Sequence, residues 1–196
     1  MRSALKDEPA ITLRERLHIN EEGLADGVRF IRSPNCDERP ADTAIELVVI
    51  HAISLPPGEF GGAGVIELFT NCLDQTAHPY YATIAGLEVS AHFLIRRDGE
   101  LVQFVRCAKR AWHAGASTWR GRSRCNDFSI GVELEGADDC KFEDAQYEQL
   151  AALTRALRAR YPIAEVLGHA DVAPGRKTDP GPHFDWAHYR TRSGLA

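Results

Sequence analysis

The sequence predicts a single α/β (α+β) domain in which helices flank a central mixed β-sheet. The chain has 196 residues, which suffices for one domain with a sizeable core and is short for two. Segments typical of strands and of helices are interspersed along the chain. One pair of strands is joined by a tight turn and must be antiparallel, so we expect a mixed sheet with helices packed on it.

Residues 1–23 are expected to form a polar N-terminal extension, and residues 24–196 the folded domain. The first 25 residues are rich in charge and lack the continuous apolar stretch of a secretion signal. No apolar run is long enough to span a bilayer. We therefore expect a cytoplasmic protein without membrane contact.

The first half of the domain predicts one buried strand and one helix. Residues 45–50 (IELVVI) form a short β-branched run that ends at His51. Residues 54–64 hold too many Pro and Gly residues for a regular element. Residues 65–72 are expected to form a short helix, and residues 73–89 remain ambiguous.

A β-hairpin is expected next, with strands at residues 91–96 and 101–105. The sequence Asp98-Gly99 between them is typical of a type I′ turn. Residues 106–127 predict a surface loop with some packed aromatic side chains. Residues 128–135 (FSIGVELE) alternate in polarity and predict a strand.

Residues 144–161 predict the clearest helix of the chain. Its apolar residues recur at spacings of three and four, Asp144 suits the first turn, and Pro162 ends it. Residues 164–168 form a short strand that leads to His169. A loop over residues 170–183 and a last helical turn or two over residues 185–190 follow.

Charge and cysteine content exclude several classes of protein. The net charge of −5 lacks the basic footprint of a nucleic-acid-binding protein. Arg120, Arg122 and Arg124 could hold a small anionic ligand or form a solvated basic loop, and the sequence leaves both open. Five cysteines, an odd number with no Cys-x-x-Cys pair, argue against a disulfide framework and against a thiolate zinc site.

Three residues form a candidate metal site. His51 and His169 directly follow predicted strands, where rigid elements lead into functional loops, and Asp179 lies in the loop after His169. Two imidazoles and a carboxylate are a common catalytic zinc set with a fourth position open for water. Alternatively, both histidines are hydrogen-bonded structural residues, which is the more common role of a lone histidine at a strand end. Ligands so far apart in sequence also lack a diagnostic local spacing.

Glu133 and Glu135 are candidates for a general base. They occupy positions i and i+2 of an otherwise apolar strand, so both face the same side. A carboxylate on a mostly buried strand is costly unless it is paired or functional, so a structural salt bridge is the alternative. Lys177 lies two residues before Asp179 and would stabilise an oxyanion if Asp179 binds metal; otherwise it is a solvated lysine.

Other nucleophilic chemistry has little support in the sequence. There is no Gly-x-Ser-x-Gly elbow and no glycine-rich phosphate loop after a strand. Cys125 and His113 could pair in principle, but nothing in the sequence orients them. We interpret His92 as a satisfied core histidine. The four histidines interpreted as surface residues are His18, His78, His183 and His188.

Several long strings resemble the AmpD family of anhydro-N-acetylmuramoyl-L-alanine amidases. They are LVVIHAISLPPGEFGG (47–62), VSAHFLIRRDGELVQFV (89–105), KRAWHAGAS (109–117), CNDFSIGVELEG (125–136) and GHADVAPGRKTDPGP (168–182). The resemblance covers roughly residues 24–190. It implies a cytoplasmic zinc amidase with a central mixed sheet flanked by helices and the zinc site in a groove at the strand ends.

The resemblance also implies roles for individual residues. His51, His169 and Asp179 would bind Zn²⁺, with Glu133 as general base and Lys177 as transition-state stabiliser. The residues implied to line the substrate groove are Trp112, His113, Arg124 and Asn126. The implied substrate is a small muropeptide of cell-wall recycling, with no nucleic acid, membrane or obligatory protein partner.

Two positions depart from the family pattern, and two other functions compete. Ala52 stands where the family usually has Asn, and Glu88 where it often has Arg, so peptide recognition is the property most open to change. The chain could instead be a non-catalytic peptidoglycan-fragment binding module, although all five residues of the implied metal and catalytic set are present. It could also be an amidase that acts on intact cell wall outside the cytoplasm.

Overall fold

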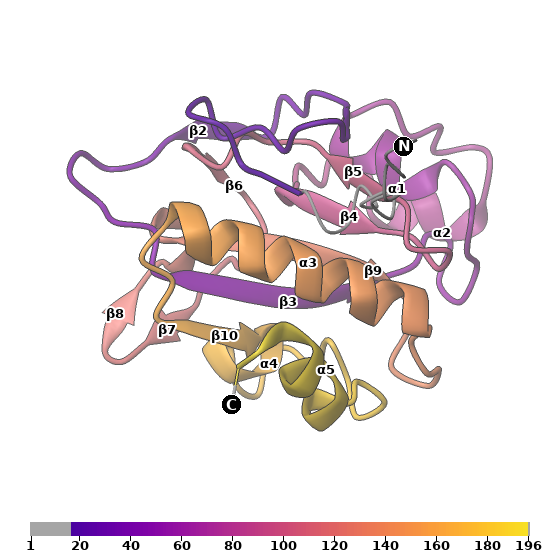
Figure 1. The fold of residues 1–196 in the computed structure, drawn as a ribbon. Helices are drawn as coiled ribbons and strands as arrows, with labels where there is room; N and C mark the ends of the chain where they lie inside the picture. The colour runs from indigo at the N-terminus through magenta and orange to yellow at the C-terminus, as the bar shows by residue number, and fades with distance from the viewer. Residues whose placement is uncertain (1–16, 196) are drawn as a thin grey trace, which may run out of the picture.

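A six-stranded mixed sheet forms the centre of the computed structural model, which describes residues 17–195 (Figure 1). In spatial order its strands are β1 (Arg29–Phe30), β5 (Leu101–Gln103), β4 (Phe93–Ile95), β9 (Ser129–Glu135), β3 (Leu47–Ile53) and β10 (Glu165–Gly168). Strands β4 and β5 pair antiparallel, and the other neighbours in this sheet pair parallel. The predicted mixed sheet is therefore confirmed.

One long helix covers one face of the sheet, as Figure 1 shows. This helix, α3 (Asp144–Arg160), begins with a capping box between Glu143 and Gln146. Its apolar stripe packs in one cluster with the side chains of β3, β4 and β9 that alternate toward it. The shorter helix α5 (Trp186–Ser193) packs beside α3, so the two predicted C-terminal helical segments are confirmed.

The opposite face of the sheet is covered by shorter elements. Helices α1 (Gly64–Phe69) and α2 (Pro79–Thr83) contribute to a cluster with the residues of β4 and β5. Around β3, Trp119, Phe128 and Val172 pack against Leu47 and Val49. Alternation along the strand then places the side chain of His51 on this second face, away from α3.

The predicted surface loop over residues 106–127 contains short strands. Strand β6 (Lys109–Ala111) pairs with β2 (Cys36–Glu38), and β7 (Thr118–Trp119) pairs with β8 (Arg122–Ser123). None of these four short segments has a residue pattern typical of a strand. The β2–β6 pairing joins segments about seventy residues apart, so local sequence patterns do not reveal it.

The turn of the predicted hairpin differs in type from the expectation. Gly99 has a φ of +85° and Asp98 is not among the residues with positive φ, whereas a type I′ turn needs both. The N–H of Gly99 donates to the carbonyl of Arg96, and the N–H of Arg96 donates to that of Glu100. The connection is thus a longer loop that closes with a left-handed glycine, and the type I′ prediction was wrong.

Two boundaries near the candidate metal ligands also differ from the prediction. Strand β3 does not end at His51 but continues to Ile53, because β9 pairs with it over this whole length. His169 is the first residue of a short helix, α4 (His169–Val172), whose other residues lie in the region expected to be a loop. Both histidines are therefore held by regular structure.

Part of the predicted N-terminal extension packs on the domain. Ile19 is 1% exposed and lies in the main apolar cluster. Gln103 donates from Nε2 to the carbonyl of Gly23 at 2.8 Å. Leu17 and Ile19 thus pack on the domain, and the boundary at residue 24 stays a prediction. The rest of the predicted extension lies outside the described residues.

His92 is the buried, hydrogen-bonded core histidine that the sequence predicted. Its Nδ1 accepts from the N–H of Gly131 at 3.0 Å, so the ring proton is on Nε2, which donates to the carbonyl of Lys109 at 3.1 Å. Burial, with the charge of Arg39 adding to it, holds the pKa of His92 well below its usual value. His92 is therefore neutral in the folded protein.

Because His92 is held neutral in the folded protein, we expect the free energy of unfolding to decrease as the pH falls below about 6.5. The unfolded chain then takes up a proton that the folded chain cannot, so the free energy of unfolding decreases by up to about 1.4 kcal/mol per pH unit from this group. Urea titrations between pH 5 and 7 would measure this slope. In the variant His92→Gln the slope should be smaller, and an unchanged slope would contradict the prediction.

Candidate metal centre and active site

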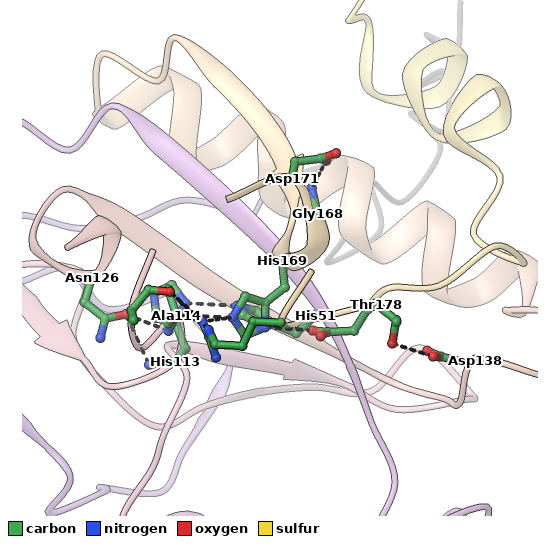
Figure 2. A network of polar contacts seen from close by, with 12 residues as sticks. His51, His113, Ala114, Asn126, Asp138, Gly168, His169, Asp171 and Thr178 are labelled. Atoms are coloured by element: carbon green, nitrogen blue, oxygen red, sulfur yellow. Dashed lines mark hydrogen bonds and ion pairs between the residues drawn. The ribbon is translucent and has the colours of Figure 1, made fainter. Parts of the chain in front are cut away.

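Three side chains from different elements converge on one point. His51 lies in β3, His169 begins α4, and Asp179 lies in the loop that follows; Figure 2 shows the two histidines meeting. Their Nδ1 atoms are 2.9 Å apart, and Oδ2 of Asp179 is 3.1 Å from each. These three residues form the metal-binding group of the described chain.

The donor set fits a divalent cation such as zinc. Bonds of about 2.0–2.1 Å in a tetrahedral site separate ligand atoms by about 3.3–3.4 Å, close to the observed triangle. Burial lowers the pKa of His51 to about 4. Burial alone would raise the pKa of Asp179, but hydrogen bonds from His169 and His51 outweigh it and hold that pKa below its ordinary value. A neutral imidazole and an ionised carboxylate are the forms that bind metal.

Each ligand histidine also uses its second ring nitrogen. Nε2 of His51 lies 2.9 Å from Nδ1 of His113, and Nε2 of His169 lies 3.2 Å from the carbonyl oxygen of Ala114 (Figure 2). Arg176 donates to the same carbonyl at 2.6 Å. The second ring nitrogens of the two ligands thus contact consecutive residues, His113 and Ala114.

Glu133 lies beside the metal-binding group. It is the direct neighbour of His51 in the parallel register of β9 and β3, on the same face of the sheet. The residue is 8% exposed, and within residues 17–195 no hydrogen-bond partner reaches its Oε2. Burial, with Asp179 adding to it and Lys177 opposing it, holds the pKa of Glu133 well above its usual value. The carboxyl group is thus poised to take up a proton.

Glu135, two residues along the same strand, is a structural ion pair. Its Oε1 accepts from Arg96 at 3.0 Å and from the N–H of Gly61 at 2.8 Å, and Oε2 accepts from the N–H of Arg97 at 3.2 Å. The pair is nearly buried, with 3% of the Glu135 side chain exposed. Of the two glutamates, Glu135 therefore holds the loop before α1, and Glu133 remains free for chemistry.

The variant Glu135→Gln is expected to lower the free energy of unfolding by about 2–3 kcal/mol. The change removes the nearly buried counter-ion of Arg96, leaves Arg96 only the ion pair with the exposed Glu100, and weakens charge-assisted hydrogen bonds. Chemical denaturation at neutral pH would measure the loss. Glu133→Gln is the matched control on the same strand and should show no such loss, so equal destabilisation of both variants would contradict the assignment.

The site opens into a groove of about 650 Å³. The metal-binding group, Glu133 and Lys177 line it, as do Trp112, His113 and Asn126 among the predicted substrate-binding residues. Arg124 is not among the lining residues; its side chain is 68% exposed and its Nε lies 3.3 Å from Asp127. The structure therefore brings together every predicted site residue except Arg124, whose contact with substrate stays a prediction.

The arginines near Arg124 do not form a common anion site. Arg120 pairs with Glu165, and Arg122 pairs with Glu46. Each of the three arginines faces a carboxylate of its own. The interpretation as a solvated loop is the one that the structure supports.

Sequence patterns missed some residues around the groove. The side chain of Arg176 and the carbonyl of Ala114 hold His169, yet an arginine in a polar loop and a backbone oxygen carry no local signal. Ala52 and Glu88, the two departures from the family pattern, both line the groove. The apolar end of the groove, also unpredicted, is lined by Leu55, Leu68, Tyr80, Ile84 and Leu87.

A cysteine nucleophile finds no support in the structure. Cys125 is buried and its N–H donates to Ser117, whereas both ring nitrogens of His113 face other partners, His51 and Ser129. The five cysteines are all unpaired thiols. Of the histidines predicted at the surface, His18 and His183 are exposed, and His78 and His188 are partly exposed.

Known proteins are similar to this chain in sequence and fold. The family model described as N-acetylmuramoyl-L-alanine amidase matches residues 41–182. The 1,6-anhydro-N-acetylmuramyl-L-alanine amidase AmpD of Escherichia coli K12 is 60% identical over 172 residues, covering 87% of this chain and 94% of that protein. A crystal structure of a selenomethionine AmpD derivative superimposes with a TM-score of 0.86 at 59% identity, over 88% of this chain and 97% of that one.

A more distant relative has been solved with a ligand. It is the amidase AmiD of E. coli in complex with the substrate anhydro-N-acetylmuramic acid-L-Ala-D-γ-Glu-L-Lys, with a TM-score of 0.57 and 30% identity. The similarity covers 81% of this chain and 65% of that one. From the family match over most of its length and these likenesses, we conclude that the chain belongs to the N-acetylmuramoyl-L-alanine amidase family.

Proposed function

We propose that this amidase hydrolyses the amide between anhydro-N-acetylmuramic acid and L-alanine in muropeptides released during cell-wall recycling. The observation that carries the proposal is the pairing of His51 with Glu133 across β3 and β9. It sets a buried carboxyl group, whose Oε2 has no hydrogen-bond partner within residues 17–195, beside a His-His-Asp metal group. Its substrate is that of the AmpD relatives, which share about 60% of its residues. The groove, rather than a flat surface, suits a small soluble fragment.

The metal of the proposed enzyme is zinc, held by His51, His169 and Asp179. A zinc ion bound there would polarise the scissile carbonyl and lower the pKa of a water molecule to about 7. Two imidazole ligands suit zinc, whereas magnesium and calcium prefer sites built from oxygen ligands. Metal analysis of the purified protein identifies the ion.

The protein's own groups move the protons in this mechanism. Glu133 takes a proton from the attacking water and passes it to the leaving amine, a role that a carboxyl group with a raised pKa fits at neutral pH. Lys177, exposed at the rim of the groove, donates from Nζ to the oxyanion that develops on the carbonyl. Trp112 contributes a face of the groove on which substrate can lie, and Arg124 stays a proposed contact at its edge.

Mass spectrometry of the products from anhydro-muramoyl tripeptide tests the proposed reaction. We expect free tripeptide and anhydro-N-acetylmuramic acid, and we expect a chelator to suppress both. Intact tripeptide after long incubation with the metal-loaded protein would contradict the proposal and favour a non-catalytic binding module.

A comparison of intact cell wall with the soluble fragment tests which class of substrate the enzyme prefers. Purified sacculi should be cleaved far more slowly than soluble anhydro-muropeptide at equal concentrations of the bond. A preference for sacculi would identify the enzyme as an amidase of the intact wall.

Lys177→Met is expected to lower kcat by about 10²–10³ with a small change in KM. The loss of one oxyanion donor affects the transition state more than the bound substrate. Steady-state kinetics on the anhydro-muropeptide would measure it. Lys141→Met is the matched control, because Lys141 is also exposed and does not line the groove; a similar loss in both variants would remove Lys177 from the mechanism.

We also propose that the protein acts in the cytoplasm. The five unpaired thiols suit a reducing compartment. Among the described residues, no helix is long and apolar enough to cross a membrane. Cell fractionation that recovers the protein with periplasmic markers would contradict this placement.

A further inference from the structure

The dipeptide His113–Ala114 contacts both histidines of the metal-binding group. The ring of His113 meets Nε2 of His51, and the carbonyl of Ala114 meets Nε2 of His169, at 2.9 and 3.2 Å. Both ligands turn their Nδ1 atoms toward Asp179. One short segment thus faces the outer nitrogen of each ligand.

These contacts determine where the ring protons lie when a cation occupies the site. A cation takes the Nδ1 lone pair of each ligand, so each Nε2 carries the proton and must donate. His51 then donates to Nδ1 of His113, and His113 carries its own proton on Nε2, 3.2 Å from Oγ of Ser129. His169 donates to the carbonyl of Ala114. A single consistent set of tautomers results.

The dipeptide is itself held in place by side chains that do not touch the ligands. Oδ1 of Asn126 accepts from the N–H of His113 at 3.2 Å and from that of Ala114 at 2.8 Å (Figure 2). Arg39 fixes the backbone of Asn126 by donating to its carbonyl at 3.0 Å. Asn126 therefore uses its acceptor on the protein, although it lines the groove.

The sheet is shaped to receive the ring of His113. The ring lies over Gly131 of β9, where a Cβ atom would come within 2.4 Å of Cγ of His113. Its plane is nearly perpendicular to that of His51, with ring centroids 5.0 Å apart. The position of this ring is thus set by packing as well as by hydrogen bonds.

We propose that His113 is a positioning residue that fixes the tautomer and orientation of the ligand His51, and that Asn126 holds His113 and Ala114 so that the same segment also orients His169. The proposal replaces a direct role of His113 in substrate binding with a role through the metal ligands. It rests on the proposed function only in taking zinc as the metal. Loss of an outer partner of a metal-bound histidine typically weakens metal binding about 10–100-fold.

Two substitutions at position 113 separate this role from packing. The Oδ1 atom of asparagine can occupy the place of Nδ1 and accept from His51, whereas the amide of glutamine reaches the place of Nε2 and Ser129. In competition of the metal-free protein with a chromophoric chelator for Zn²⁺, we expect His113→Gln to bind zinc about 10–100-fold more weakly than wild type. His113→Asn should remain within about threefold of wild type.

The control is His92→Gln, a change in an equally buried histidine whose ring centroid lies 5.8 Å from that of His113 and which does not contact the ligands. This variant should lose thermal stability but keep zinc affinity. Equal weakening by His113→Gln and His113→Asn, or loss of zinc affinity in His92→Gln as large as in His113→Gln, would overturn the proposal. Wild-type protein that binds no zinc would overturn the metal assignment itself, whatever the substrate.

A second pair of variants covers the possibility that position 113 tolerates no change. Asn126→Asp keeps the Oδ1 acceptor and Asn126→Leu removes it at similar volume. Zinc affinity should fall at least tenfold in Asn126→Leu and little in Asn126→Asp. Nitrogen-15 shifts of the zinc-loaded wild type should report a proton on Nε2 of His113, and a proton on Nδ1 would contradict the proposed relay.

Discussion

Replacement of Glu133 by glutamine is expected to lower kcat by about 10²–10⁴ while leaving the metal bound. An amide of the same shape cannot accept the proton of the attacking water or return it to the leaving amine. Glu133 is not one of the three converging donors, so the metal-binding group stays intact. Steady-state hydrolysis of anhydro-muramoyl tripeptide and metal content of the same sample would measure both effects.

The stability of Glu133→Gln provides an internal check on this prediction. The change removes a buried carboxyl group whose Oε2 has no hydrogen-bond partner within residues 17–195, so the free energy of unfolding should not fall. A variant that is stable, holds metal and turns over slowly has lost chemistry alone. Wild-type turnover in this variant would show that another group acts as the base.

His169→Ala is expected to abolish turnover through loss of the metal. Removal of a ligand leaves two donors, and zinc affinity should fall by more than the 10–100-fold that loss of an outer partner costs. Chelator competition measures the affinity, and product formation at saturating zinc measures the turnover. The reason lies in the geometry, because Nδ1 of His169 is within 3.1 Å of both other donor atoms.

His183→Ala is the matched control for the ligand change. His183 is exposed, lies in the loop just beyond Asp179, and does not line the groove. Its variant should keep wild-type zinc affinity and turnover. If His169→Ala retained one zinc ion per chain with unchanged affinity, His169 would not be a ligand.

Much of the fold could be predicted from local sequence. The apolar period of residues 144–161 predicted α3, and the alternation of residues 128–135 predicted β9 almost to the residue. Local patterns were least informative for strands that pair with segments far away in the sequence, as β2 does with β6. They also failed where the backbone conformation determines the turn type, as at Asp98-Gly99. In those places the energy that selects the structure comes from contacts that a local window does not contain.

The metal-binding group illustrates the same division. Residue types and their placement near strand ends offered His51, His169 and Asp179 as metal ligands only beside the alternative of structural histidines. The resemblance of the surrounding strings to the family selected the metal site. The structure brings His51 and Asp179, 128 positions apart, to 3.1 Å. The parallel pairing of β3 with β10 sets His169 beside His51, and the N–H of Ala170 donates to the carbonyl of Asp179, which holds that residue near the same point.

The sequence by itself determined the residue types, the order of the main strands and helices, and the family, because periodicity and long matching strings are properties of the chain alone. Only the tertiary structure decided which of the two strand glutamates is free. Glu135 pairs with Arg96, which directly follows β4, whereas Oε2 of Glu133 has no hydrogen-bond partner within residues 17–195. It also decided that His113 turns toward His51 and that Asn126 holds the backbone of His113 and Ala114. Hydrogen bonds between distant segments depend on strand register, which neighbouring residues do not encode.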